Sequence, residues 1–308
     1  AKINTEYMKV IIENSINFDN KLFLNNKISS FVAWLSNKNY LYLAISINMQ
    51  VVNFFNDESD NIQLVRRSLA LMMSSQIFES LCMFDKAVNS SSQASVNLNV
   101  FFTDIPSLSG RSVMESGRLM LNRGAFQTSE YHLFISLREF LRDITNSYMN
   151  IEKTLRFTAI LYLNKNKNDD SEKIFLELRS FWKKINRKES TIQNIEYLIA
   201  LNSFYRKTTR YNLSISALLD AKKFIITENF YYSNINYIIL TEMVISYLDI
   251  NDTTMAEKTL LEVKVIADKI FYENHPLISK YYISIARLNQ IRNNYSISEI
   301  NFNKAIEI

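Results

Sequence analysis

The chain has 308 residues, of which 47% are hydrophobic and 21% are charged, as is normal for a soluble globular protein. It contains only 3 Gly and 2 Pro and has no Asn-Gly or Asp-Gly pair, so an all-β fold built on tight hairpins is disfavoured. The net charge of +4 is spread over nearly equal numbers of bases and acids, without a concentrated basic stripe. Nucleic acid is therefore expected as a partner only through another domain.

The single cysteine, Cys82, excludes an internal disulfide and fits a reducing, cytoplasmic location. The most apolar run, Tyr40 to Phe55, is interrupted by polar residues and falls short of the ~20 apolar residues that a membrane span needs. The chain starts without Met and without the pattern of a signal peptide, so we expect a mature product or a piece of a longer protein.

The first 88 residues read as a helical region. Apolar residues at roughly helical spacing predict a helix within residues 1–25, ending near Asn20. Residues 28–35 and 40–55 predict a helix pair, and residues 61–88 predict one long helix with an apolar face at three- and four-residue steps. We define residues 1–88 as an N-terminal helical region.

Residues 89–124 read as an irregular linker. The Ser- and Asn-rich run at 89–95 indicates a loop, and the alternation of Val96, Leu98 and Val100 with asparagines indicates a short extended stretch. All three glycines and Pro106 follow within twenty residues, with a short helix expected at 112–121. The segment is a connector or, as the alternative, an active-site loop.

Residues 125–308 contain an internal repeat. After a helix predicted at 128–147, Ser214, Ala256 and Ser298 follow one another at 42-residue spacing, and each opens the second helix of a helix pair. An earlier pair, over residues 155–178, matches with an offset of 43. A single amphipathic pair cannot hide its apolar face, so tandem pairs are expected to stack into a solenoid.

The positions shared by these pairs resemble the tetratricopeptide repeat family. The last unit carries the pattern as Tyr282, Ile285-Ala286, Asn289, Ser298, Phe302 and Ala305. The 42-residue spacing and the His275-Pro276 pair resemble the long repeats of kinesin light chains. The resemblance covers about residues 150–308, although the family's usual Gly is replaced by Ala159, Asn202, Val244 and Ala286. It implies an all-α, right-handed α-solenoid of antiparallel helix hairpins, with a less regular N-terminal part.

The resemblance also implies a binding surface, because the first helices of such repeats line a concave groove. The residues at the corresponding positions combine aliphatic side chains with six cations and one acid, which suits an acidic, amphipathic protein segment or peptide. These residues are Lys153, Arg156, Ile160, Glu196, Ile199, Ser203, Arg206, Lys207, Ile238, Thr241, Ile245, Lys280, Ile283 and Arg287. Asn202 is expected to face a neighbouring helix, so capture of a C-terminal carboxylate is not predicted.

Catalytic constellations are sparse. His132 and His275 are the only histidines, so a Cys/His zinc site is excluded, and no phosphate-binding or nucleophile motif occurs. No cofactor, no metal and no enzymatic activity are predicted. The leading hypothesis is a scaffold or regulatory module that binds protein or peptide; the alternatives are the sensing or assembly half of a bacterial regulator, or an enzyme that uses the 89–124 segment. The last repeat would expose an apolar edge, which predicts a homodimer or further chain beyond Ile308.

Overall fold

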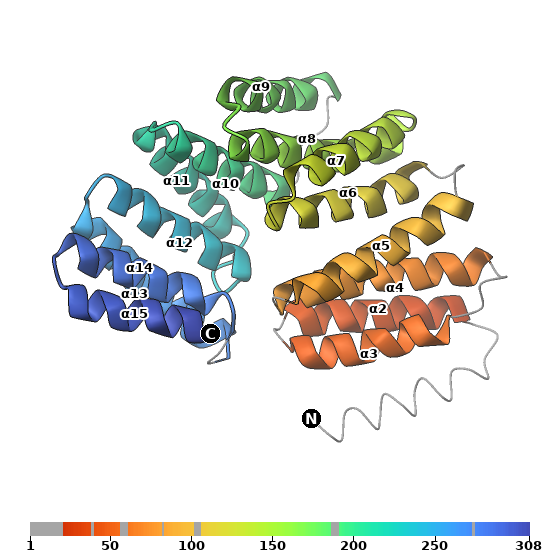
Figure 1. The fold of residues 1–308 in the computed structure, drawn as a ribbon, viewed down its shortest axis with the longest axis horizontal. Helices are drawn as coiled ribbons and strands as arrows, with labels where there is room; N and C mark the ends of the chain where they lie inside the picture. The colour runs from red at the N-terminus through yellow and green to blue at the C-terminus, as the bar shows by residue number, and fades with distance from the viewer. Residues whose placement is uncertain are drawn as a thin grey trace. The chain divides into compact units, whose positions relative to one another are not determined.

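The computed structural model describes residues 21–37, 40–55, 61–81, 83–101, 106–185, 191–272 and 275–308. In these ranges every regular element is an α-helix (Figure 1), which confirms the predicted all-α class. The described helices are α2 (Lys21–Asn37), α3 (Leu41–Phe54), α4 (Asn61–Ser80), α5 (Phe84–Phe101), α6 (Pro106–Asn122), α7 (Phe126–Leu141), α8 (Ile144–Asn164), α9 (Asn168–Ile185), α10 (Thr191–Lys207), α11 (Tyr211–Thr227), α12 (Asn234–Asp249), α13 (Thr253–Ile270), α14 (Ile278–Ile291) and α15 (Tyr295–Glu307). The helix predicted near the N-terminus lies outside the described residues.

Consecutive helices form antiparallel pairs, from α2–α3 through α14–α15; the sequence analysis predicted such repeated pairs for the second half of the chain. We call the first helix of each pair helix A and the second helix B. The chain divides into two compact units, Ala1–Phe157 and Thr158–Ile308. The first has an apolar core that includes Val32 and Leu98, and the second has one that includes Leu218 and Tyr237.

The turns that join helix A to helix B share one hydrogen-bonding pattern. In each turn a backbone N–H donates to the carbonyl five residues earlier, at 2.7–2.9 Å, as in the Schellman motif that ends many helices. The donors are Tyr40, Met83, Ala125, Lys167, Arg210, Asp252 and Asn294. Where the preceding residue is described, it has a left-handed φ between 59° and 76°; these residues are Gly124, Asn166, Thr209, Asn251 and Asn293. Glycine and asparagine adopt this conformation readily, and Thr209 is the exception.

A second recurring feature is a pair of buried residues, twelve positions apart, where helix B crosses helix A. All of them are buried, and the helix B member is Ala or Ser in every described hairpin. The pairs are Val32/Ala44, Ser75/Ala87, Gly117/Ser129, Ala159/Ser171, Asn202/Ser214, Val244/Ala256 and Ala286/Ser298. Successive pairs lie 42 or 43 residues apart. The close approach of two helix backbones favours a small side chain on helix B at each of these crossings.

The N-terminal half therefore keeps the register that the sequence analysis recognised only from about residue 150. The hydroxyl of Ser129 donates to the carbonyl of Gly117 (2.8 Å), and Ser171 donates to Ala159 in the same way (2.8 Å). At Gly117 an added Cβ would lie 3.0 Å from Leu133 Cγ, so this crossing leaves little room for a side chain. The hairpin α6–α7 is thus a regular member of the series, whereas the proposed region boundaries at 88 and 124 stay predictions.

The predicted loop and extended stretch at 89–100 are wrong, because these residues belong to α5. Ala87, Ser91, Ala94 and Leu98 are fully buried at helical spacing, whereas Val96 is 62% exposed. The small side chains that resemble loop composition let α5 lie close to its neighbours, and Ser91 shares a 2.7 Å hydrogen bond with Ser116 of α6.

Two predicted helices are in fact interrupted. The helix expected at 61–88 ends with α4 at Ser80, where the Met83 N–H bonds to the Phe78 carbonyl and α5 begins. The helix expected at 128–147 ends with α7, and α8 starts at Ile144. Apolar periodicity continues across both breaks, so periodicity alone could not place them.

Candidate functional site

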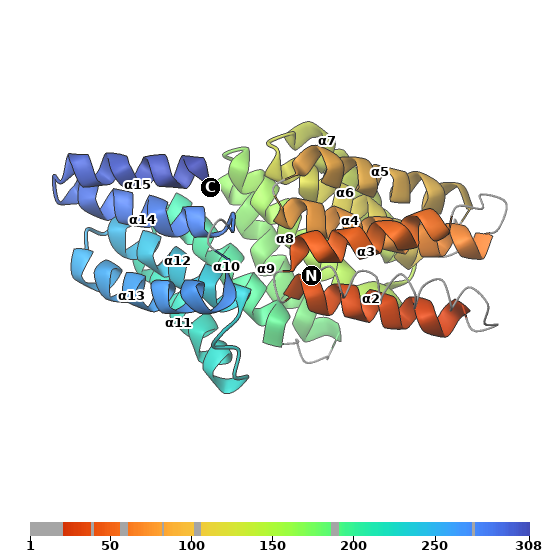
Figure 2. The same cartoon turned by 90° about the horizontal axis from the view of Figure 1, so that it is seen from below.

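The predicted groove residues lie on helix A of four hairpins: α8, α10, α12 and α14. Within the second unit, α10 contacts α12 and α12 contacts α14, so their surfaces are continuous (Figures 1 and 2). We call this surface of α10, α12 and α14 the helix-A face. Its predicted members are mostly half-buried; Lys207 and Ile283 are exposed, whereas Thr241 is buried.

Charged residues of three helices converge on this face. Arg206 of α10 donates from Nε to Asp249 Oδ2 (2.8 Å) and from Nη1 to Glu242 Oε2 (3.1 Å). Arg287 of α14 donates to Asp249 Oδ1 (2.9 Å), and Lys280 lies 3.7 Å from Glu242 Oε1. We call these five residues the charge cluster. Three cations share two carboxylates, so the cluster keeps one excess positive charge.

The two carboxylates were missed by the sequence analysis, which selected residues by repeat position and found six cations with a single acid. Glu242 and Asp249 follow Ile238 at steps of four and eleven residues, with Ile245 between them at seven. That is one stripe of an α-helix, so the spacing within α12 could have revealed both acids. Their pairing with α10 and α14 depends on tertiary structure.

The charge cluster is partly shielded from water, since its side chains are between 15 and 42% exposed. Ion pairs in such positions contribute more than fully exposed pairs, whose typical worth is below about 1 kcal/mol. A guanidinium carries five N–H donors. Arg206 donates from Nε and Nη1, and Arg287 donates from Nη2, to acceptors among the described residues. The other N–H groups of both guanidiniums can donate to a guest carboxylate.

A network of buried hydrogen bonds adjoins the charge cluster. Ser214 Oγ donates to Asn202 Oδ1 (2.6 Å), and Ser246 Oγ donates to the same oxygen (3.1 Å), which ties α10, α11 and α12 together. The amide of Asn202 reaches Glu242 Oε2 at 3.5 Å. Asn202 thus faces neighbouring helices, as predicted, and is not available to a guest carboxylate.

The remaining predicted cations have partners of their own. Lys207 Nζ donates to the Leu163 carbonyl near the end of α8 (2.6 Å), a favourable place for a cation because of the helix dipole. Arg156 is buried and donates to Glu152 one turn earlier (3.1 Å). Lys153 lies in the first unit, where its charge acts on Glu115.

The first unit carries a comparable ionic group on its own helices A. Arg118 of α6 donates to both carboxylate oxygens of Glu79 on α4 and also to Glu115. Burial alone would raise the pKa of Glu115, but the charge and hydrogen bonds of Arg118 outweigh it and hold that pKa below its usual value. Arg118 stands at the repeat position that Ile160, Ser203, Ile245 and Arg287 occupy later in the chain.

No protein-family model and no curated protein match this chain. Solved structures do match. The quorum sensor NprR from B. thuringiensis, in its apo form, covers 99% of this chain and 93% of its own, with 10% identity and a TM-score of 0.56. A putative kinesin light chain from Podosopora anserina, with nearly identical TPR-like repeats, covers 66% of this chain and 95% of its own, with 14% identity and a TM-score of 0.50.

The chain has a tetratricopeptide-like repeat fold. The likeness to kinesin-light-chain repeats agrees with the 42-residue spacing, and the match along 99% of the chain agrees with a register that continues through its N-terminal half. At these identities the comparisons establish the fold alone. The described residues include no helix that is long and apolar enough to cross a membrane, and no group of three His, Cys, Asp or Glu side chains suited to a metal ion.

Proposed function

We propose that this tetratricopeptide-like protein is a non-enzymatic binding module, a scaffold or regulator, whose helix-A face holds a protein segment or peptide. The observation that carries the proposal is the charge cluster, in which Arg206, Lys280 and Arg287 outnumber the two carboxylates. An acidic side chain of the guest would accept hydrogen bonds from the two guanidiniums at little cost, since these are already partly desolvated.

Aliphatic side chains surround the cluster. Ile199, Ile238 and Ile245 are half-buried on the helix-A face, and Ile283 is 38% exposed. An apolar side chain of the guest, next to its acidic one, would cover these isoleucines. The face is therefore suited to an extended or helical segment that alternates acidic and apolar residues. Within the second unit, Ile160, Glu196, Ser203 and Lys207 would extend the interface along α8 and α10.

The test is affinity capture of partners, followed by titration of the captured segment. Arg206→Gln and Arg287→Gln remove the donors without reversing a partly buried charge, and we expect each to weaken binding by roughly tenfold, the worth of a charged hydrogen bond. Arg292→Gln is the matched control, because Arg292 pairs with Glu257 of α13, away from the cluster. Binding that both variants leave intact would place the partner on another surface.

A second candidate is the sensing or assembly part of a bacterial regulator. It is favoured by the match to a quorum sensor along nearly the whole chain. Under this hypothesis the complete gene encodes an effector or DNA-binding domain beside this one, and a signalling peptide added to the intact protein changes the affinity of that domain for its target. A complete gene that encodes no such domain would end this hypothesis.

We also propose that a second copy of the chain covers α15. Ile297, Ile300 and Ile306 of this helix are 49, 55 and 80% exposed. Light scattering should give the mass of a dimer, and Ile300→Glu should convert it to monomer. A wild-type protein that is monomeric at all concentrations would refute the proposal.

A further inference from the structure

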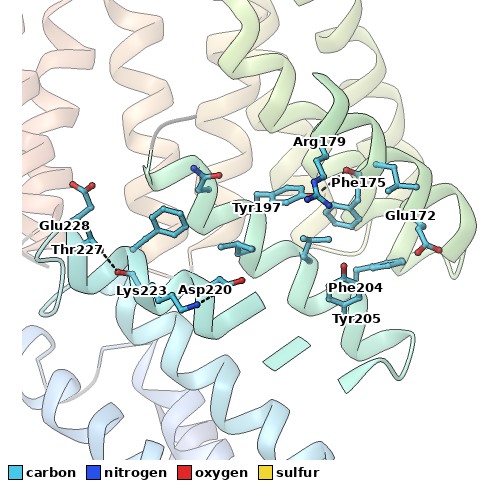
Figure 3. Close-up of a pocket in the computed structure, with 15 residues that line it drawn as sticks. Glu172, Phe175, Arg179, Tyr197, Phe204, Tyr205, Asp220, Lys223, Thr227 and Glu228 are labelled. Carbon is cyan, nitrogen blue, oxygen red and sulfur yellow. Dashed lines mark hydrogen bonds and ion pairs between the residues drawn. The ribbon is translucent and has the colours of Figure 1, made fainter. Parts of the chain in front are cut away.

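A cavity of about 760 Å³ lies between α9, α10 and α11, on residues that do not belong to the helix-A face (Figure 3). Each helix contributes side chains at steps of three and four residues, so the lining follows the helices as a groove. The apolar part of the lining comprises Phe175, Leu176, Tyr197, Phe204, Tyr205 and Phe224, among others. We call this groove the open seam.

The same interval one repeat later is closed. The residues of α10 that line the groove are half-exposed, except Phe204, whereas their counterparts 42 positions later on α12 are buried between α11 and α13. Tyr197 corresponds to Ile239 and Leu198 to Leu240, both 0% exposed, and Tyr205 corresponds to Tyr247, which is 7% exposed. The open seam is thus a place where the regular stacking of hairpins leaves an apolar surface uncovered.

An ion pair marks the difference between the two seams. In the closed seam Lys222 of α11 bridges to Glu262 of α13, with Nζ 2.7 Å from Oε2. The corresponding residues of the open seam are Arg179 of α9 and Asp220 of α11. Asp220 pairs instead with Lys223 of its own helix, at 2.8 Å.

Arg179 is left beside the rings of Phe175 and Tyr197 (Figure 3), with no hydrogen bond or ion pair to the described residues. Its guanidinium is therefore a cation at the wall of an aromatic groove, without an anionic partner among the described residues. The carboxylates that also line the groove have other partners, since Glu172 pairs with Arg210, Asp220 pairs with Lys223 and Glu228 interacts elsewhere. Arg179 is exposed, and an anionic group entering the groove would accept charged hydrogen bonds from its guanidinium.

We propose that the open seam binds a small, elongated amphipathic carboxylate of the fatty-acid type. Its apolar body lies between the rings of α9, α10 and α11, and its carboxylate accepts hydrogen bonds from Arg179. The cavity volume lies within the roughly 300–1,000 Å³ of small-molecule sites. The α10 floor from Asn194 to Tyr205 spans about 16 Å, enough for an extended alkyl chain of about ten carbons. The inference is independent of the proposed peptide site, because the two use different stripes of α10.

The test is isothermal titration of the intact protein with sodium decanoate, and with 1-decanol as the neutral analogue of the same length. We expect one decanoate site per chain. Arg179→Gln should weaken decanoate binding by roughly tenfold and leave decanol binding unchanged, since only the carboxylate uses the guanidinium. Lys222→Gln, the same repeat position in the closed seam, is the matched control and should alter neither.

A second variant tests the location of the apolar body. Thr227→Trp places a large side chain at an exposed position of the groove and should reduce binding of both molecules, whereas Lys269→Trp, at the same position of α13, should not. The proposal is overturned by absence of one-to-one decanoate binding, by many weak sites that ignore Arg179, or by unchanged binding in Thr227→Trp. Binding of decanoate and decanol with equal affinity in the wild type would refute the role of Arg179.

Discussion

The small-residue crossings can be tested directly at Ala256, where α13 crosses α12. Ala256 and its counterpart Val244 are both 0% exposed, so the site has no room for three further carbon atoms. Overpacking a well-filled core costs roughly 1–3 kcal/mol, and Ala256→Leu should lie near the upper end because both helix backbones approach here. Ala256→Ser should be nearly neutral, since serine occupies this position in four other hairpins.

Calorimetry of the intact protein measures this cost. For a unit of about 150 residues, 3 kcal/mol corresponds to a decrease in Tm of about 6–12 °C. In Ala256→Leu, amide hydrogen exchange should be faster than in the wild type in α12 and α13 and unchanged in the first unit. A Tm for Ala256→Leu within a degree of that for Ala256→Ser would show that the crossing tolerates a large side chain and that a small residue is not required there.

Two further predictions concern local features. His275 is buried against Phe271, with ring centroids 4.2 Å apart, and burial lowers its pKa to about 4. Because the unfolded chain binds this proton near pH 6.5, stability should be full above that pH and fall by up to about 3 kcal/mol as the pH drops toward 4. His275→Gln should flatten that part of the urea-unfolding profile, and an unchanged profile would contradict the argument. Thr209 holds a left-handed φ of 60° that costs a β-branched residue about 1 kcal/mol. Thr209→Asn should therefore raise Tm by roughly 2–4 °C, and Asn251→Thr should lower it comparably; a Tm that falls in Thr209→Asn would contradict this.

The sequence could predict the second half of the fold because Ser214, Ala256 and Ser298 recur at a fixed spacing within clear amphipathic helices. It did not predict the repeat in the first half, where Ser75 and Ala87 fall within what reads as one long helix and Gly117 lies in a segment that reads as an irregular linker. Small polar side chains have weak helix propensity, and only their burial between helices explains why α5 forms there.

The candidate site was predictable to a similar extent. Repeat position identified Arg206 and Arg287 as members of one face, whereas their shared contact with Asp249 depends on how α10, α12 and α14 lie against one another. The open seam could not be predicted from the sequence. Tyr197 and Leu198 have the hydrophobic character of their buried counterparts, and only the position of α9 leaves them partly uncovered.

The recurring turn has an evolutionary consequence. Each hairpin from α6–α7 onward carries its own left-handed residue at the turn and its own small helix B residue at the crossing, within one period of the sequence. In-frame duplication or deletion of a gene segment that encodes one period would join a hairpin to a neighbour of the same design, with no change of register on either side. Proteins built in this way can change length by whole modules while each surviving module folds as before.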